Sequence, residues 1–591
     1  MATQEDSKTI DEAGSAGREE GRAATVIGVL GAGTMGNGIA QLAARAGAKT
    51  LLYDPFPDAL QKGTESARKG LAKEAQKGKL SEQQAQAASE RLTPVDDMAA
   101  LSGCELVIEA APERLELKHE MYGKLSEIVG EECVLASNTS SLLVTAIATG
   151  ASHPERVVGM HFFNPAPLMA LLEVVAGVRS SSRALALARA TGEAMGKTVI
   201  VAKDGPGFIV NRCNRPFGLE ALRLLQEQVA DVQTIDRICR MEGGFRMGPF
   251  ELMDLVGVDT GFEISQSFYA QSFGEPRWRP SMIAARYVAA GLYGRKSGRG
   301  YYDYGAGAHR PEDPGPPRAG AAGPDGAGAS GPARPGPRDR AVADRPPGGE
   351  GVVVIAGEGV VARQLREAAR EAGYEVRAPH EPSGGVLPAL FIDCDARPPA
   401  RERPPGEAPA VDRRGAVAQS HGGARLLLCA YGSLSALDPQ GSAVGFHVLA
   451  PLERAGLVEL TRSETSSPLA AARAERFFAA LGKHVAWVGD APGLVLGRIV
   501  CQVINESAFA LGEGVGSARD IDLGMVLGLS HPRGPLAWAD AIGLQHVLGV
   551  LEALCAEYRE ERYRPAPALR RMVAAGRLGG DSGEGFFAYE D

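Results

Sequence analysis

The sequence predicts a chain of two related halves, each with a doubly wound α/β domain followed by an all-α domain. An apolar run at Val26–Leu30 leads into a glycine-rich loop and then a helical pattern, as in the opening βαβ unit of such a sheet. After Gly-Pro-Gly at residues 205–207, the apolar periodicity becomes wholly helical. Both patterns return after residue 350, so we expect a duplication with a degenerate second copy.

Length and composition bound the class of protein. A chain of 591 residues is too long for one core. With 44% apolar and 23% charged residues and no apolar run near the ~20 residues of a membrane span, we expect a soluble protein without a membrane segment. The net charge of -9 argues against a general nucleic-acid surface. Eight scattered cysteines without a C-x-x-C pair indicate reduced thiols in a cytoplasm, and we expect no metal site.

Composition shifts divide the chain into six segments. A polar N-terminus without a signal peptide and a Gly/Pro/Ala-rich stretch both predict disorder. The expected segments are a disordered tail (1–23), a dinucleotide-binding α/β domain (24–206), a helical domain (207–304), a disordered linker (305–350), a degenerate α/β domain (351–492) and a second helical domain (493–591).

The glycine loop predicts a dinucleotide site of the Rossmann type. Gly31 permits a tight turn, Gly33 lets the backbone approach a pyrophosphate, and Gly36 lets helix and strand pack closely. The helix that starts at Thr34-Met35 then faces the phosphates. The strand at 50–53 ends at Asp54, an acid placed to bind the ribose hydroxyls. Asp54 would repel a 2′-phosphate, so the sequence favours NAD over NADP.

The rest of the first sheet is predicted from short apolar runs, at 106–110, 134–136, 157–163, 171–175 and 198–202. Glu113 and Lys118 follow one of these strands, and Ser137-Asn138-Thr139-Ser140-Ser141 follows the next. Ligands of doubly wound sheets collect at such strand ends, although small polar residues there also serve as helix caps.

A histidine and a glutamate stand twelve residues apart on neighbouring strands. His161 lies in the apolar run 157–163, and Glu173 lies in the run 171–175. Two strands that double back place these side chains together, and a carboxylate beside an imidazole is the arrangement of a general base. The alternative is a core histidine with satisfied hydrogen bonds. The same spacing recurs as His447 and Glu459.

The second half lacks several features of the first. Its loop carries a carboxylate, Glu358, where a phosphate would bind, and Ala362 stands in place of Gly36. A constant offset aligns Asn211 with Gly497, Asn164 with Ala450 and Ser140 with Leu426. We therefore expect this half to be catalytically silent.

The quoted motifs give the chain a family resemblance. Ser137–Ser141, His161-Phe162-Phe163-Asn164-Pro165, Gly207-Phe208-Ile209-Val210-Asn211-Arg212 and Met247-Gly248-Pro249-Phe250-Glu251-Leu252 resemble the L-3-hydroxyacyl-CoA dehydrogenase family. The chain is most similar to its bacterial 3-hydroxybutyryl-CoA or 3-hydroxyadipyl-CoA dehydrogenase form, which has a second dehydrogenase-like half. The resemblance covers about 26–304 specifically and about 352–589 weakly.

The resemblance implies roles for individual residues. It makes His161 the base, Glu173 its acidic partner, and Ser140 and Asn211 the groups that contact the substrate hydroxyl. It implies NAD contacts at Asp54, Glu113, Lys118, Asn164 and Lys296, and coenzyme A contacts at Ser66 and Lys73. From spacing alone, the helix that carries Lys73 is a solvated face or a patch for a phosphate-bearing substrate.

The resemblance also implies an activity. We expect NAD-dependent oxidation of an (S)-3-hydroxyacyl-CoA with a short chain, such as 3-hydroxybutyryl-CoA, in fatty acid or related acyl-CoA degradation. In the family the helical domains form a dimer interface, so we expect the two helical domains of this chain to pair, and dimerisation of whole chains stays open. The alternatives are a non-catalytic acyl-CoA-binding scaffold and an NAD-dependent dehydrogenase of a free hydroxy acid.

Overall fold

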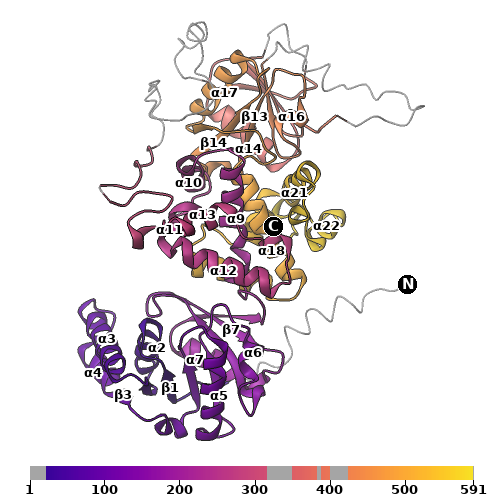
Figure 1. Ribbon diagram of the computed structural model, residues 1–591. Coiled ribbons are helices and arrows are strands. Elements are labelled where there is room, and N and C mark those ends of the chain that lie inside the picture. Colours follow the sequence, from indigo (N-terminus) through magenta and orange to yellow (C-terminus); the bar gives the residue numbers. More distant parts are fainter. Residues whose placement is uncertain (1–20, 306, 316–348, 382–387, 400–423, 590–591) are drawn as a thin grey trace, which may run out of the picture. The chain divides into compact units, whose positions relative to one another are not determined.

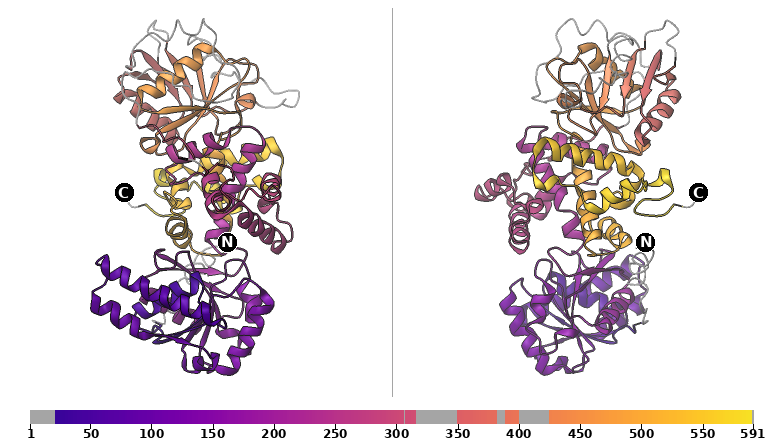
Figure 2. Two further views of the ribbon diagram at one scale, coloured as in Figure 1. Left: turned by 60° about the vertical axis from the view of Figure 1, so that its left-hand side comes forward. Right: turned by 90° about the vertical axis from the view of Figure 1, so that its right-hand side faces the viewer.

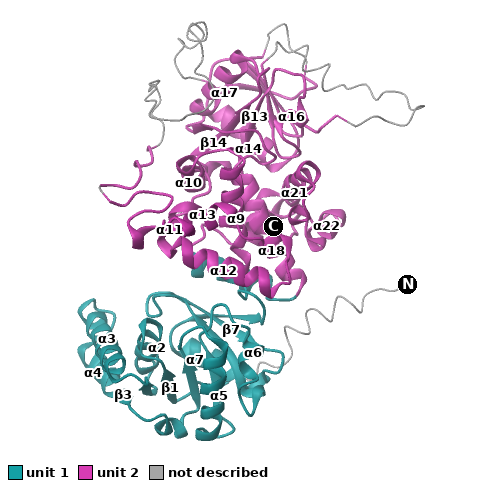
Figure 3. Ribbon diagram, in the orientation of Figure 1, with its two compact units in different colours: residues 1–210, 514–529 teal, residues 211–513, 530–591 magenta. Residues whose placement is uncertain are grey.

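The structure is a computed structural model that describes residues 21–305, 307–315, 349–381, 388–399 and 424–589 (Figure 1). The expected disordered tail, apart from its last three residues, and most of the expected linker lie outside these ranges. The chain forms two compact units, coloured in Figure 3. Unit 1 comprises residues 1–210 and 514–529, and unit 2 comprises 211–513 and 530–591. These limits differ from the expected domain limits because one helix of the second half packs within unit 1.

Unit 1 is built on an eight-stranded sheet of order β3-β2-β1-β4-β5-β6-β7-β8. Neighbouring strands are parallel except for the antiparallel pair β6–β7. The order reverses at β1, so the crevice at the carboxyl ends of β1 and β4 is the expected ligand position. The strands are β1 Val26–Leu30, β2 Lys49–Tyr53, β3 Leu92–Val95, β4 Leu106–Glu109, β5 Val134–Ser137, β6 Val157–Phe162, β7 Leu171–Ala176 and β8 Thr198–Lys203.

Helices flank this sheet in each of the views in Figures 1 and 2. Their limits follow local chemistry: α3 begins at a proline, which suits a first helical position, and α4 begins at a capping box formed by Ser81 and Gln84. The helices are α2 Thr34–Arg45, α3 Pro57–Gln76, α4 Glu82–Arg91, α5 Leu115–Ile128, α6 Val144–Ala148, α7 Ser182–Ala194 and α19 Ala518–Leu529.

Helix α19 belongs to the second half in sequence but packs on β7 and β8 of the first sheet. The segment before it adds a backbone hydrogen bond, from Lys203 N–H to the Val515 carbonyl at 2.8 Å. Near its end, a Cβ at Gly528 would lie 2.9 Å from Leu171 and 3.4 Å from Phe163. A larger residue at this position would have to displace these side chains.

Unit 2 contains both helical modules and the second sheet. Its sheet has the order β10-β9-β11-β12-β13-β14-β15, again with one antiparallel pair, β13–β14. The strands are β9 Val352–Ala356, β10 Glu375–Arg377, β11 Leu390–Asp393, β12 Arg425–Leu428, β13 Val444–His447, β14 Leu457–Arg462 and β15 His484–Trp487. The helices are α8 Val210–Cys213, which starts at the unit boundary, α9 Arg215–Gln226, α10 Val232–Met241, α11 Pro249–Val256, α12 Val258–Gln271, α13 Met282–Ala289, α14 Val360–Glu371, α16 Leu434–Leu437, α17 Pro468–Ala480, α18 Leu496–Gly512, α20 Pro535–Ile542, α21 Leu544–Tyr558 and α22 Pro567–Ala574.

The two helical modules of unit 2 pack together, as expected, mainly through α9 and α18. Two buried arginines join them in a reciprocal pattern. Arg212 donates to Glu506 at 2.8 Å and to Glu513 at 2.7 Å. Arg498, 286 residues later, donates to Glu220 at 2.5 Å and to Glu227 at 2.6 Å. The internal repeat therefore forms an isologous interface of the kind found in twofold dimers, within one chain.

The contact made by α19 in unit 1 has a counterpart in unit 2. Helix α10 of the first helical module packs against β14 of the second sheet. Gly489 N–H donates to the Val229 carbonyl at 2.7 Å, in positions equivalent to Lys203 and Val515. In each helical module, the equivalent helix therefore packs on the α/β domain that belongs, in sequence, to the other half of the chain.

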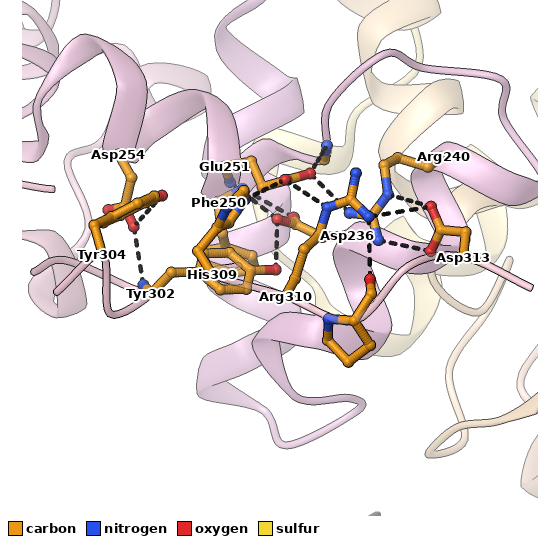
Figure 4. Close-up of polar contacts among 12 residues, drawn as sticks. Asp236, Arg240, Phe250, Glu251, Asp254, Tyr302, Tyr304, His309, Arg310 and Asp313 are labelled. Atoms are coloured by element: carbon orange, nitrogen blue, oxygen red, sulfur yellow. Dashed lines mark hydrogen bonds and ion pairs between the residues drawn. The ribbon is translucent and has the colours of Figure 1, made fainter. Parts of the chain in front are cut away.

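The prediction of a disordered linker from residue 305 is wrong for its first residues. His309 and Arg310 each lie 2.7 Å from the Glu251 carboxylate, and Asp313 pairs with Arg240 at 2.7 Å (Figure 4). Glu251 is 2% exposed. Composition alone predicted disorder, but these three residues pair with Arg240 of α10 and with the buried Glu251 of α11.

Among the described residues, no single helix is long and apolar enough to cross a membrane, although the bent pair α20–α21 passes the same length and composition test when taken together.

The arginine clusters predict a large effect on stability. Arg498→Leu would leave the buried carboxylate of Glu220 and the partly exposed carboxylate of Glu227 without the cation that joins them, and breaking such a buried pair costs about 3–5 kcal/mol. Urea unfolding of the full chain measures this loss. The control is Arg570→Ala, because Arg570 and Glu552 form an exposed pair of the kind that contributes ~0–1 kcal/mol. Equal stability of the two variants would contradict the assignment.

Candidate active site

The predicted contact between His161 and Glu173 is confirmed. Antiparallel register sets the two residues opposite each other on β6 and β7. His161 Nδ1 lies 2.7 Å from Glu173 Oε2, and both side chains are buried. Because a carboxylate accepts only, Nδ1 carries the hydrogen, and in the neutral ring the lone pair is then on Nε2. The imidazole is therefore held in the tautomer that a general base needs.

The Glu173 carboxylate is held in place by backbone groups. Its Oε1 accepts hydrogen bonds from Ile209 N–H and Val210 N–H, both at 3.1 Å. Its other oxygen is left for His161. Phe163 and Phe208 lie against the imidazole with ring centroids 4.6 and 5.7 Å away. The pair therefore sits between two aromatic rings, with the Nε2 edge as its reactive side.

Ser140 brings a hydroxyl to that reactive edge. Its Oγ lies 3.1 Å from His161 Nε2. Glu113 shapes the turn, since its Oε1 accepts from Thr139 Oγ1 at 2.7 Å and from Ser140 N–H at 2.7 Å. Burial raises the pKa of Glu113, but the Lys118 ammonium and these hydrogen bonds outweigh it, so the net pKa lies below its usual value.

Beneath this turn lies a buried network that sequence reasoning missed. Lys118 Nζ lies 2.7 Å from Glu109 Oε1 and 3.3 Å from Glu113 Oε2, with 1% of its side chain exposed. Ser137 Oγ donates to Glu109 Oε2 at 2.7 Å, and Asn138 Oδ1 accepts from Phe162 N–H at 2.9 Å. Lys118 thus supports Glu113 from below. The sequence feature that could have indicated this network is Glu109, an acidic residue at the end of an apolar strand.

The glycine loop has the geometry expected of a phosphate-binding turn. Gly31 has φ of +94°, and a Cβ at Gly36 would lie 1.7 Å from the Gly31 carbonyl. No heavy atom lies within 4 Å of a Cβ built at Gly33, and no described side chain caps α2 there. The chain therefore leaves open space beside Gly33 at the start of α2, as a phosphate-binding turn requires. Asp54 accepts from Ala32 N–H at 2.8 Å, which fixes its carboxylate beside the loop.

The remaining predicted residues are spread more widely. Asn164 is exposed just beyond β6, and Ser66 and Lys73 lie exposed on α3, two helical turns apart. Asn211, in α8, and Lys296 belong to unit 2. Lys296 forms an ion pair with Asp259 at 2.6 Å.

Comparison with known proteins gives the family. Residues 26–205 match the family model "3-hydroxyacyl-CoA dehydrogenase, NAD binding domain", and residues 207–304 and 493–589 each match "3-hydroxyacyl-CoA dehydrogenase, C-terminal domain". The chain belongs to the 3-hydroxyacyl-CoA dehydrogenase family. It is an NAD-dependent oxidoreductase with two C-terminal helical domains.

Two relatives resemble the chain over nearly its whole length. It is 34% identical to the 3-hydroxyadipyl-CoA dehydrogenase of Escherichia coli K12, over 93% of this chain and 97% of the relative. The solved 3-hydroxybutyryl-CoA dehydrogenase of Escherichia coli K12 matches with 31% identity and a TM-score of 0.73, over 93% of this chain and 98% of that one. A probable 3-hydroxybutyryl-CoA dehydrogenase of Bacillus subtilis is 40% identical but covers 47% of this chain, with 96% of its own length.

In the second half of this dehydrogenase, the equivalent histidine and glutamate do not form a hydrogen bond with each other. His447 and Glu459 are opposite in register, but Glu459 accepts Val495 N–H with one oxygen and Leu496 N–H with the other. His447 Nδ1 has no hydrogen-bond partner in the described part of the chain, and Nε2 lies 3.1 Å from His546 Nε2. Burial lowers the pKa of both histidines, His546 to about 4, so the two rings are neutral at pH 7.

The position of Asn211 is closed in the second half. A Cβ at the equivalent Gly497 would lie 2.1 Å from His447 Cε1. The imidazole therefore occupies the space that an asparagine side chain would need.

A carboxyl group from the first helical module enters this second site. Glu242, at the end of α10, is equivalent to Gly528 in the repeat, and it accepts from Leu449 N–H at 3.3 Å. Ligand-type atoms of Glu242, His447 and Glu459 lie within 4.8 Å of one another. Burial raises the pKa of Glu242 and raises that of Glu459 to about 8, and each is hydrogen-bonded to the other. The two carboxyl groups thus share a proton at neutral pH.

The constant offset misaligned Ser140. Asp204 caps Val144 and Thr145, and Asp490 caps Leu434 and Ser435 in the same way. Around the helices that these aspartates cap, equivalent residues of the two halves therefore lie 290 residues apart. The reason is that the connection from α16 to β13 is shorter than the connection from α6 to β6. Ser140 corresponds to Ala430 rather than to Leu426, which lies inside β12. The serine is absent from the second half under either alignment.

The shared proton predicts a pH dependence of stability. A carboxyl whose pKa is raised on folding keeps its proton up to about pH 8, whereas the unfolded chain loses it near pH 4.5. The free energy of unfolding therefore falls between these values as pH rises, by up to ~1.4 kcal/mol per pH unit for one proton. Glu242→Gln supplies a neutral hydrogen-bond donor and should flatten this decline.

Thermal melts of the full chain and of Glu242→Gln from pH 5 to 9 measure this dependence. The exposed carboxylate of Glu453 gives the matched control, Glu453→Gln, which should keep the wild-type slope. The shared proton would be refuted if the melting temperature changed with pH in the same way in all three proteins. It would also be refuted if the purified wild type contained a stoichiometric divalent metal.

Proposed function

We propose that His161 is the general base that takes the proton of the 3-hydroxyl group. Glu173 holds Nδ1–H at 2.7 Å, so the Nε2 lone pair faces Ser140 Oγ and the space beside it. A substrate oxygen beside Ser140 Oγ would lie within hydrogen-bond reach of Nε2. The single observation that carries the proposal is this Ser140–His161–Glu173 chain, placed at the carboxyl edge of a sheet with a dinucleotide loop.

Glu173 stabilises the imidazolium that forms. Its two backbone hydrogen bonds keep it fixed while the proton arrives, so little reorganisation is needed. Ser140 and Asn211 donate to the substrate oxygen as the alcohol becomes a ketone. For Ser140 the support is geometric, and for Asn211 it is the family resemblance at the start of the helical domain.

Cofactor binding is divided among the predicted residues. The turn at Gly31, Gly33 and Gly36, with the α2 residues Thr34 and Met35, holds the pyrophosphate, and Asp54 binds the adenosine ribose. NAD+, when bound, accepts the hydride from C3. We assign further contacts to Glu113, Asn164 and Lys296, whereas Lys118, which is buried under two carboxylates, acts by positioning Glu113.

The substrate is an acyl-CoA, with Ser66 and Lys73 on the exposed face of α3 as contacts for its phosphate-bearing end. We propose a short acyl chain, since the relatives are named for four-carbon and six-carbon acyl groups. Fatty acid or related acyl-CoA degradation is the corresponding role. The cytoplasm is the proposed location, supported by eight free cysteines, all within the described ranges. A non-catalytic scaffold would not need the base, its orienting carboxylate and the serine together.

The base assignment predicts the behaviour of His161→Gln. Glutamine cannot take a proton, and loss of a general base removes roughly 10²–10⁴-fold of the rate. The oxidation of NADH by acetoacetyl-CoA measures turnover. The matched control is His447→Gln, in the second half, which should retain wild-type turnover. Near-native activity of His161→Gln would exclude it as the base.

We propose that the second half is catalytically silent and acts as a built-in partner subunit. Its reciprocal Arg–Glu interface in unit 2 and its helix α19 in unit 1 support this role. Glu173 lies on β7, one of the strands that α19 covers.

This role predicts that α19 controls activity in the first half. Gly528→Glu would force a side chain against Leu171, Val210 and Phe163, where overpacking costs about 1–3 kcal/mol. Displacement of Phe163, which contacts His161, should lower kcat/KM at least ~10-fold. Gly580→Glu is the control, since no heavy atom lies within 4 Å of a Cβ there. If both variants have the kcat/KM of the wild type, α19 does not control activity.

A further inference from the structure

A buried lysine of unit 1 lies beside the loop that follows the strand of His161. Lys197 stands between α7 and β8, with 7% of its surface exposed. Because Thr198 of β8 pairs with Leu171 of β7, Lys197 is level with the end of the connection from β6 to β7. Residues 163–170 form this connection, the β6–β7 loop. The lysine therefore reaches a segment that begins two residues after His161.

The amino group of Lys197 holds two backbone carbonyls of the β6–β7 loop. Its Nζ donates to the Ala166 carbonyl and to the Met169 carbonyl, both at 2.6 Å. Within the loop, Leu168 N–H and Met169 N–H donate to the Pro165 carbonyl at 2.9 and 3.1 Å. In the described part of the chain, no other side chain forms a hydrogen bond with this loop. Lys197 is thus its side-chain anchor.

This position is costly for a cation. Among the described residues, no carboxylate forms an ion pair with Lys197. Burial and the nearby Arg45 guanidinium lower the pKa of Lys197 to about 8, although Glu74 opposes this shift. Removing a charge from water without a counter-ion costs free energy. With or without its third proton, the amino group has one N–H donor for each carbonyl, so we expect the contact to persist on both sides of that pKa.

The β6–β7 loop carries two residues next to the reacting groups. Phe163 lies against the His161 ring, with ring centroids 4.6 Å apart, and Asn164 follows it on the surface. The loop also packs on α2, the helix of the glycine loop, because a Cβ at Gly38 would lie 2.9 Å from Pro167 Cδ. A shift of the loop would therefore move the ring that contacts the base together with the residue assigned to the cofactor.

We propose that Lys197 is a positioning residue for the reaction, which holds Phe163 beside the base and Asn164 beside the cofactor. This inference rests on the proposed function, because His161 is there the base and Asn164 a cofactor contact. Because Lys197 is buried, it acts through the loop backbone and not by contact with a ligand. The two carbonyl hydrogen bonds carry its effect to both residues.

The second half offers a matched position. Lys483 lies before β15 as Lys197 lies before β8, and the two are equivalent in the repeat. Lys483 Nζ donates to the Leu452 carbonyl at 2.8 Å and to the Glu453 carbonyl at 3.5 Å. A lysine that anchors this loop is therefore common to both halves, with the shorter pair of hydrogen bonds in the first.

The alternative is that both lysines serve the fold alone. The loop of the second half carries Ala450 where Asn164 stands in the first half, so loss of Lys483 removes an anchor without misplacing a cofactor contact. A purely structural loss lowers the fraction of folded enzyme and with it the apparent kcat. It leaves KM of the remaining folded molecules unchanged. KM for NADH therefore separates the two roles.

The experiment measures kcat and KM for NADH, with acetoacetyl-CoA as substrate, in the full-length enzyme. Methionine has a similar length but no N–H donor, so Lys197→Met should release the loop. We expect KM for NADH to rise at least ~10-fold, since a misplacement of about 1 Å can cost ~10²-fold. Lys483→Met is the control and should keep the wild-type KM. Lys197→Gln, which is shorter but keeps two N–H donors, should give an intermediate KM, and it replaces Lys197→Met if that variant does not fold.

A double variant tests whether the effect passes through Asn164. In an Asn164→Ala background, Lys197→Met should raise KM for NADH no more than about twofold, because the contact is already lost, whereas independent effects would multiply. A wild-type KM in the Lys197 variants, an equal rise in Lys483→Met, or a fully multiplicative double variant would overturn the inference. Near-native turnover in His161→Gln would instead overturn the proposed function, so the two failures are distinguishable.

Discussion

Two buried arginines between α9 and α18 are the constraint on which the helical part of this chain depends. Arg212 and Arg498 each neutralise two glutamates of the opposite module. Desolvation offsets much of the attraction in such pairs, so they contribute more to register than to net stability. A slip of one helix along the other would separate these charges, of which four are buried: Arg212, Arg498, Glu220 and Glu506. The duplicated sequence supplies both partners of the interface, so one chain forms a contact with twofold character by itself.

The sequence predicted the His161–Glu173 pair because strand geometry alone decides it: a short reversal after β6 puts residues twelve apart opposite each other. The same spacing does not produce the same hydrogen bond in the second half. His447 and Glu459 are also opposite in register, yet Val495 and Leu496 use both oxygens of Glu459. Which oxygen a backbone N–H selects depends on side-chain rotation, and no spacing rule contains that information. The exchange of α10 and α19 between halves was equally hidden, because it depends on long-range packing.

The equivalent positions Gly528 and Glu242 show how one helix end can serve two purposes. In unit 1 the glycine leaves room for Leu171 and Phe163 beside the base. In unit 2 the glutamate fills the corresponding space and shares a proton with Glu459. With Glu459 engaged and Gly497 in place of an asparagine, the imidazole turns to His546. The packing around His447 therefore differs from that around His161 at several residues and not at one alone.

The internal repeat separates structural from chemical requirements without any other sequence. Asp204 and Asp490 cap equivalent helices, and Asp254 and Asp540 each accept two backbone N–H groups at the end of their modules. These residues persist in both copies because the fold needs them. Ser140 and Asn211 have no counterpart, although the helices and strands around them do. Where backbone support is retained and only the hydrogen-bonding side chains differ, the requirement that was relaxed is chemical, which supports the roles proposed for Ser140 and Asn211.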